Sequence, residues 1–149
     1  MEQQEYAQRG YLREDFRLFH LKGAMEEQLD WHYHTFHKLI FFLGGPSGYG
    51  VEGIVDRPRV IDNRSTKPGD VILVPQGCVH RPEAAPGAPY ERVILYLSPD
   101  YLARAGTADC PLDSCFALAT ARFRFVLRPQ EGRQALRRTL FALESASAQ

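Results

Sequence analysis

The chain has 149 residues, a mass of 16.9 kDa, and 18 acidic and 18 basic side chains. This length suits one domain-sized core, and the charge balance excludes the strongly basic surface typical of domains that neutralise nucleic-acid phosphates. The longest apolar run, residues 39–43, is too short to cross a bilayer, and residues 1–5 lack the features of a secretory signal, so we expect no membrane association.

Proline and glycine punctuate the middle of the chain. Eight of the ten prolines lie within residues 46–99, and eight of the twelve glycines lie within residues 44–87. Both residue types interrupt helices, so this region favours short strands joined by turns. The predicted strands are Phe16–Leu21, Leu29–His34, Lys38–Leu43, Tyr49–Val55, Arg59–Asn63, Asp70–Val74, Val79–Pro82 and Tyr90–Leu97. This pattern predicts a mainly all-β sandwich or barrel.

Helical signals begin after residue 98. Ser98-Pro99 predicts a helix start with Ser98 as the N-cap and Gly106 as the stop. Residues 130–147 form a second predicted helix, in which Leu136, Leu140 and Leu143 make one apolar stripe. This stripe either packs on the chain's own barrel or forms a dimer seam, and we favour the seam.

Three cysteines, Cys78, Cys110 and Cys115, are odd in number and include no Cys-x-x-Cys pair. This usage predicts reduced thiols in a cytoplasmic protein. Cys78 is interpreted as a small buried hydrophobe rather than a nucleophile.

Histidines cluster in the segment Trp31–Lys38. In an extended strand, side chains alternate between faces, which places His32, His34 and Lys38 on one face and His37 on the other. A second segment, residues 69–80, contains a turn at Pro75-Gln76-Gly77 that leads to His80.

Together these segments resemble the two motifs of the cupin superfamily. The second motif, Gly-x5-Pro-x-Gly-x2-His, matches at Gly69, Pro75, Gly77 and His80. The first matches at His32 and His34 but departs at its last position, where Lys38 replaces a glutamate. The resemblance implies a double-stranded β-helix, a small jelly-roll-like barrel, with C-terminal α-helices.

The segment around the first motif, residues 31–45, is similar to the N-terminal effector-binding and dimerisation domain of AraC-type transcription regulators. That resemblance implies an N-terminal arm and cupin barrel over residues 1–98. It implies a short helix, a strand and a dimerisation or linker helix over residues 99–149. It further implies a small-molecule effector, a homodimer, and DNA contact only through a helix-turn-helix part that is not among these residues.

The resemblance also raises the question of a metal. Metal-bearing cupins use histidines and a glutamate, which would correspond here to His32, His34 and His80 with a divalent ion such as Zn, Mn, Fe or Ni. Because Lys38 adds a cation where a carboxylate would attract the ion, we favour a site without metal or other cofactor.

The charge of Lys38 instead predicts an anionic partner or ligand. A buried ammonium is costly unless it is paired, so we expect an anionic partner, first a protein carboxylate such as Glu52 or Glu83 and otherwise an acidic ligand. The predicted function is a ligand sensor without catalytic residues, in which His32, His34, Lys38 and His80 bind a small polar effector, a sugar or small acid. The alternative is a stand-alone metal-dependent cupin enzyme, such as a dioxygenase, isomerase or epimerase.

Overall fold

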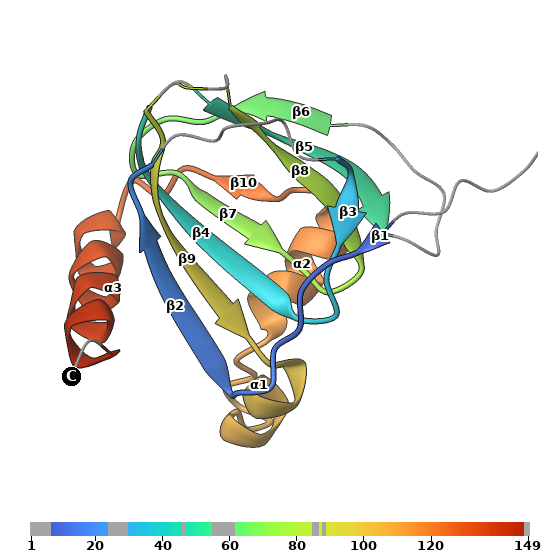
Figure 1. The fold of residues 1–149 in the computed structure, drawn as a ribbon. Coiled ribbons are helices and arrows are strands. Elements are labelled where there is room, and N and C mark those ends of the chain that lie inside the picture. Colours follow the sequence, from blue (N-terminus) through green and yellow to red (C-terminus); the bar gives the residue numbers. More distant parts are fainter. Residues whose placement is uncertain are drawn as a thin grey trace, which may run out of the picture.

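The short strands predicted from the sequence form two five-stranded sheets that face each other (Figure 1). A computed structural model describes residues 7–23, 30–45, 47–54, 62–84, 87 and 89–147. The strands are β1 (Ala7–Gln8), β2 (Phe16–Leu21), β3 (His32–Tyr33), β4 (His37–Gly44), β5 (Ser47–Ile54), β6 (Asp62–Ser65), β7 (Val71–Val74), β8 (Cys78–Ala84), β9 (Glu91–Leu97) and β10 (Val126–Leu127). One sheet has the order β1-β3-β8-β5-β6 and the other β10-β7-β4-β9-β2. This arrangement is the expected cupin-type barrel.

Most predicted strands agree with the observed ones to within two residues at each end, and two differ more. The strand predicted over residues 29–34 is reduced to β3, because residues 30–31 and 34 are not in the ladder and residue 29 lies outside the described residues. The strand predicted over residues 59–63 begins outside the described residues and continues as β6. The alternation of side chains survives the break after β3, so both histidine-bearing segments still face the barrel interior.

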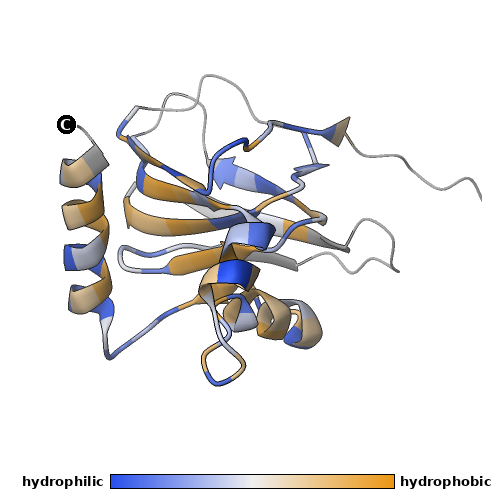
Figure 2. Cartoon of the chain, turned by 90° about the horizontal axis from the view of Figure 1, so that it is seen from below, coloured by the Kyte–Doolittle hydropathy of each residue, from blue (hydrophilic) through white to orange (hydrophobic). Residues whose placement is uncertain are grey.

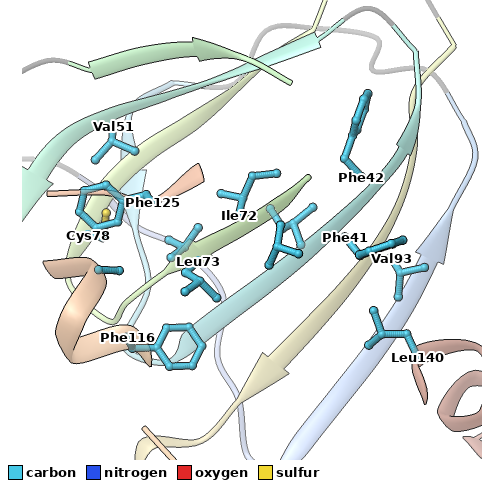
Figure 3. Packing of buried hydrophobic residues seen from close by; sticks show 14 of the residues in the cluster. Phe41, Phe42, Val51, Ile72, Leu73, Cys78, Val93, Phe116, Phe125 and Leu140 are labelled. Atoms are coloured by element: carbon cyan, nitrogen blue, oxygen red, sulfur yellow. The ribbon is translucent and has the colours of Figure 1, made fainter. Parts of the chain in front are cut away.

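The central strand β4 is buried on both of its faces. Phe42 is 1% exposed and points toward the opposite sheet, whereas Phe41 lies on the outer face beside Val93 and Leu140 (Figure 3). Burial on both faces explains why residues 39–43 form a continuous apolar run rather than an alternating one.

Three helices follow the barrel strands. Helix α1 (Pro99–Ala105) has the predicted N-cap, with the Tyr101 N–H donating to Ser98 Oγ at 3.2 Å, and it ends at Gly106 as expected. Helix α2 (Ser114–Arg122) was not predicted, and it packs against β7. Strand β10 then joins β7 antiparallel, so residues after 98 complete one of the two sheets.

Helix α3 (Arg133–Ser147) stands beside the barrel wall and packs against β2 (Figure 2). Its Leu140 is 3% exposed and belongs to the core of its own chain, and Leu136 packs against that core. Leu140 and Leu136 therefore pack on the chain's own barrel, and the dimer seam stays a prediction. Within the described residues, no helix has the length and apolarity to cross a membrane.

Candidate functional site

His32, His34, Lys38 and His80 meet inside the barrel. His32 of β3 and His80 of β8 are direct partners across an antiparallel ladder, and one ring nitrogen from each of the three histidines lies within 4.8 Å of the others. All four side chains are buried, with exposures from 0% for His80 to 7% for Lys38. The two sequence motifs thus predicted the residues that the fold brings together.

The turn after β7 positions the segment that contains His80 beside the segment that contains His34. Gly77 has φ +76°, a conformation that favours glycine, and its N–H donates to the carbonyl oxygen of His34 at 2.8 Å. The Cys78 N–H donates to the Pro75 carbonyl at 3.1 Å, which closes the turn. The Pro-x-Gly spacing therefore joins the start of β8 to the segment that holds His34.

Backbone carbonyls set the tautomer of each histidine. His32 Nδ1 lies 2.7 Å from the carbonyl oxygen of Asp30, and His34 Nδ1 lies 2.7 Å from that of Arg9. His80 Nδ1 lies 2.8 Å from the carbonyl oxygen of Cys78. Because a carbonyl oxygen only accepts, each Nδ1 must carry the proton. In the neutral ring, each Nε2 then presents a lone pair.

The amine of Lys38 lies among these lone pairs. Its Nζ donates to Nε2 of His80 at 3.1 Å and to Nε2 of His34 at 3.4 Å. Burial lowers the pKa of Lys38 to about 7, because the barrel interior disfavours the charged form. Desolvation, followed by repulsion from Lys38, lowers the pKa of His34 to about 3 and holds that of His80 well below its ordinary value.

Two carboxylates, those of Glu52 and Glu83, were expected as partners of Lys38. Glu83 accepts a hydrogen bond from Arg81 Nε at 3.0 Å, so it serves another cation. The side chain of Glu52 lies outside the described part of the chain. The partners that the structure gives to Lys38 are the two imidazole nitrogens, which corrects the expectation for Glu83.

The N-terminal arm reaches this cluster. Strand β1 lies parallel to β3, and the Arg9 N–H donates to the Tyr33 carbonyl at 2.9 Å. The next bond of the arm is the one from His34 Nδ1 to the Arg9 carbonyl. Sequence reasoning missed this contact, since a backbone carbonyl leaves no signal in the residue types.

Aromatic rings flank the cluster on one side. Tyr96 of β9 stands opposite Lys38 in the ladder, and its ring lies 4.5 Å from that of Phe36 and 6.2 Å from that of His34. From the sequence, Phe36 and Tyr96 fit either a core position, which is favoured, or stacking on a sugar ring. Their position gives the cluster an apolar wall.

His37 points away from the cluster, as alternation predicts. Its ring stacks on Phe116 of α2 with centroids 4.3 Å apart, and its Nδ1 accepts from the Gln76 N–H at 3.0 Å. A groove of about 500 Å³ runs along this outer face. It is lined by His37, Pro75, Gln76, Asp113, Phe116, Ala117, Thr120 and Ala121.

The three cysteines are free thiols, as their spacing predicts. Cys78 is fully buried next to the cluster, and burial raises the pKa of its thiol to about 12. A thiol with so high a pKa stays protonated at neutral pH and is a poor nucleophile.

A family model described as the AraC-like ligand binding domain matches residues 18–149. The chain belongs to this family. The match includes β3 to β10, most of β2, the histidine cluster and all three helices, so this AraC-type domain is a ligand-binding unit of cupin fold. A comparison with curated proteins found no match.

Solved structures similar to this AraC-type domain include several cupins. A cupin-like protein from Thermotoga maritima is 16% identical, with a TM-score of 0.39 over 58% of this chain and 60% of that one. A cupin-family protein from Methanocaldococcus jannaschii is 16% identical, with a TM-score of 0.41 over 56% and 70%. A mutant oxalate decarboxylase from Bacillus subtilis is 19% identical, with a TM-score of 0.43 over 58% of this chain and 22% of that one.

The fold family raises the question of a divalent metal, and the spacing of the three histidine nitrogens alone would suit one. Lys38 does not suit it, because its Nζ already lies within hydrogen-bonding distance of two of those nitrogens. A protonated amine has donors and no lone pair, so it repels a cation. The residues present do not fit a divalent ion in this domain.

Proposed function

We propose that this AraC-type domain senses a small polar effector inside the barrel, bound by His32, His34, Lys38 and His80. The observation that carries the proposal is the position of His34. Its Nε2 accepts from Lys38, while its Nδ1 donates to the Arg9 carbonyl of the N-terminal arm. A molecule that displaces either bond acts on the arm as well as on the cluster.

The chemistry of the cluster favours an effector that carries both hydroxyls and an acid group. Neutral imidazoles with Nδ1–H present Nε2 lone pairs, which accept from hydroxyls. Among its described partners, Lys38 has imidazole nitrogens but no carboxylate, so an acidic group would complement its charge. The rings of Phe36 and Tyr96 offer an apolar surface for a carbon skeleton. A sugar acid combines these features.

Binding regulates the domain through the arm. Two bonds attach the arm at Arg9, one from its N–H to Tyr33 and one from His34 to its carbonyl. A ligand shifts the equilibrium between the docked and the released arm only to the extent that the ligand binds these two arrangements with different affinity. The homodimer and a DNA-binding helix-turn-helix part, which the family resemblance implies, belong to this proposal as the elements that respond.

Thermal unfolding of the 149-residue protein tests the binding site. The probes are gluconate, malonate and glucose, all in buffer with a metal chelator. We expect gluconate to raise Tm saturably and glucose to raise it less, because glucose lacks the carboxylate. The Lys38→Met variant should lose the gluconate shift, whereas Lys67→Met, which removes an exposed lysine, should keep it.

Hydrogen exchange at the Arg9 amide tests the coupling to the arm. Bound gluconate should change the protection of this amide, and Lys38→Met should abolish the change. The proposal is wrong if none of the three probes raises Tm, or if the gluconate shift persists unaltered in Lys38→Met.

A further inference from the structure

The three buried histidines of the cluster bring several hydrogen-bond acceptors close together. Three Nδ1 atoms are committed to backbone carbonyls, so three Nε2 lone pairs face one another inside the protein. Lone pairs that meet no donor in a dry interior are costly. The fold therefore needs a positively polarised group at their meeting point.

Lys38 supplies that group. Its stem enters from β4, and its Nζ donates to His80 at 3.1 Å and His34 at 3.4 Å. In turn, the imidazoles provide acceptors for an amine that is only 7% exposed. The rings of His34 and His80 and the amine thus compensate one another's burial.

We infer that the Lys38 amine is a tethered cation that occupies the three-histidine cage and keeps transition-metal ions out of it. The cage itself has the donors of a metal site, since three neutral imidazoles with one open position suit Zn²⁺ and Co²⁺. Ligation with bonds of about 2.0–2.1 Å would place the nitrogens about 3.3 Å apart, whereas they now lie within 4.8 Å of one another.

Both the position and the charge of the Lys38 amine disfavour the binding of such an ion. An ion bonded to His80 Nε2 would lie no more than about 5 Å from Nζ, given the 3.1 Å contact and a bond of about 2 Å. At that distance, a unit charge and a double charge repel strongly in a partly desolvated site. Removal of the amine should therefore convert the effector site into a metal site, independently of whether any effector binds.

Metal titration of the whole chain tests this inference. Wild type, Lys38→Met and Lys67→Met are titrated with Co²⁺ and Zn²⁺ in the same buffer at about pH 6.5. We expect Lys38→Met to bind one ion per chain at least about a hundredfold more tightly than wild type. Its Co²⁺ form should show the visible absorption bands of a nitrogen-ligated ion, and Lys67→Met should behave as wild type.

Two further variants control for folding and for the identity of the ligating residues. Lys38→Gln keeps a neutral polar chain in the cage and serves if Lys38→Met unfolds, as judged by Tm. The double variant Lys38→Met/His34→Gln removes one ligand and should lose the gained affinity. The inference is overturned if wild type binds Co²⁺ as tightly as the Lys38 variants. It is also overturned if neither Lys38 variant gains a site, or if the double variant keeps the gained affinity.

Discussion

His20 of β2 bonds Glu144 of α3 through its Nδ1, with 2.7 Å between the nitrogen and Oε2. Its Nε2 lies at the same distance from Oε2 of Glu91 on β9. The imidazole also stacks on Phe141, with ring centroids 5.7 Å apart. One side chain of the barrel wall thus holds the C-terminal helix by a polar and an aromatic contact.

The first prediction follows from this contact. His20→Gln should destabilise the protein by about 1.5–3 kcal/mol, the range for a hydrogen bond to a charged group. Urea unfolding measures the change, and hydrogen exchange should show it first in α3. Arg104→Gln is the control, since Arg104 and Asp15 form an exposed pair worth at most about 0.5 kcal/mol. Equal losses in both variants would contradict the assignment.

Lys38 should make stability depend on pH. Its pKa is about 7 in the folded protein and near 10.5 when the chain unfolds. Between these values the unfolded state binds more protons, so stability rises with pH over that window; below about 7 the full cost of the buried charge remains. Lys38→Met removes this pH dependence. The stability of wild type relative to Lys38→Met should therefore rise by on the order of a few kcal/mol between about pH 7 and pH 10. A pH-independent difference in urea unfolding would refute the prediction.

Gly45 should not tolerate a side chain. It has φ +110°, and a Cβ there would lie 2.0 Å from the carbonyl oxygen of Pro89, which is backbone and cannot rotate away. Gly45→Ala should therefore cost at least about 2 kcal/mol. Gly87 has φ +82° with open space around it, so Gly87→Ala carries only the conformational strain, about 1 kcal/mol. Thermal unfolding of the two variants separates the clash from the strain.

Phe116 should anchor α2 to the barrel. It is 2% exposed and stacks on His37, so Phe116→Ala should cost about 3 kcal/mol or more. Leu118, on the same helix, is 50% exposed, and Leu118→Ala should change stability by less than about 0.5 kcal/mol. Chemical denaturation compares the two, and a similar loss for both would show that α2 is not part of the core.

Local signals predicted most of the barrel because its strands are short and separated by proline and glycine. Helix α1 could be predicted to the residue, since Ser98 and Gly106 are strong end signals. Helix α2 was not predicted because the sequence signals at its two ends are weak. Asp113 makes no side-chain capping bond, and Phe123, rather than glycine, takes the left-handed position at its C-terminus with φ 49°.

The candidate site shows the same division between local and long-range information. Alternation along one strand placed His34 and Lys38 together, and the turn motif placed His80. The pairing of the arm with β3 and the bond from His34 to Arg9 depend on contacts across 25 residues. Residue types do not encode such a register. For the same reason, Glu144 could not be matched to His20 in advance.

The pairing of β10 with β7 also constrains how the protein is made. Strand β7 is buried and wholly apolar, and among the described residues its outer edge gains a neighbour only from 125–127. On a ribosome, all other barrel strands leave the tunnel before this last one. Until Leu127 has emerged, a nascent chain exposes an unpaired apolar edge of the kind that recruits other strands. Synthesis of the barrel therefore has a late, aggregation-sensitive interval that only the arrival of β10 ends.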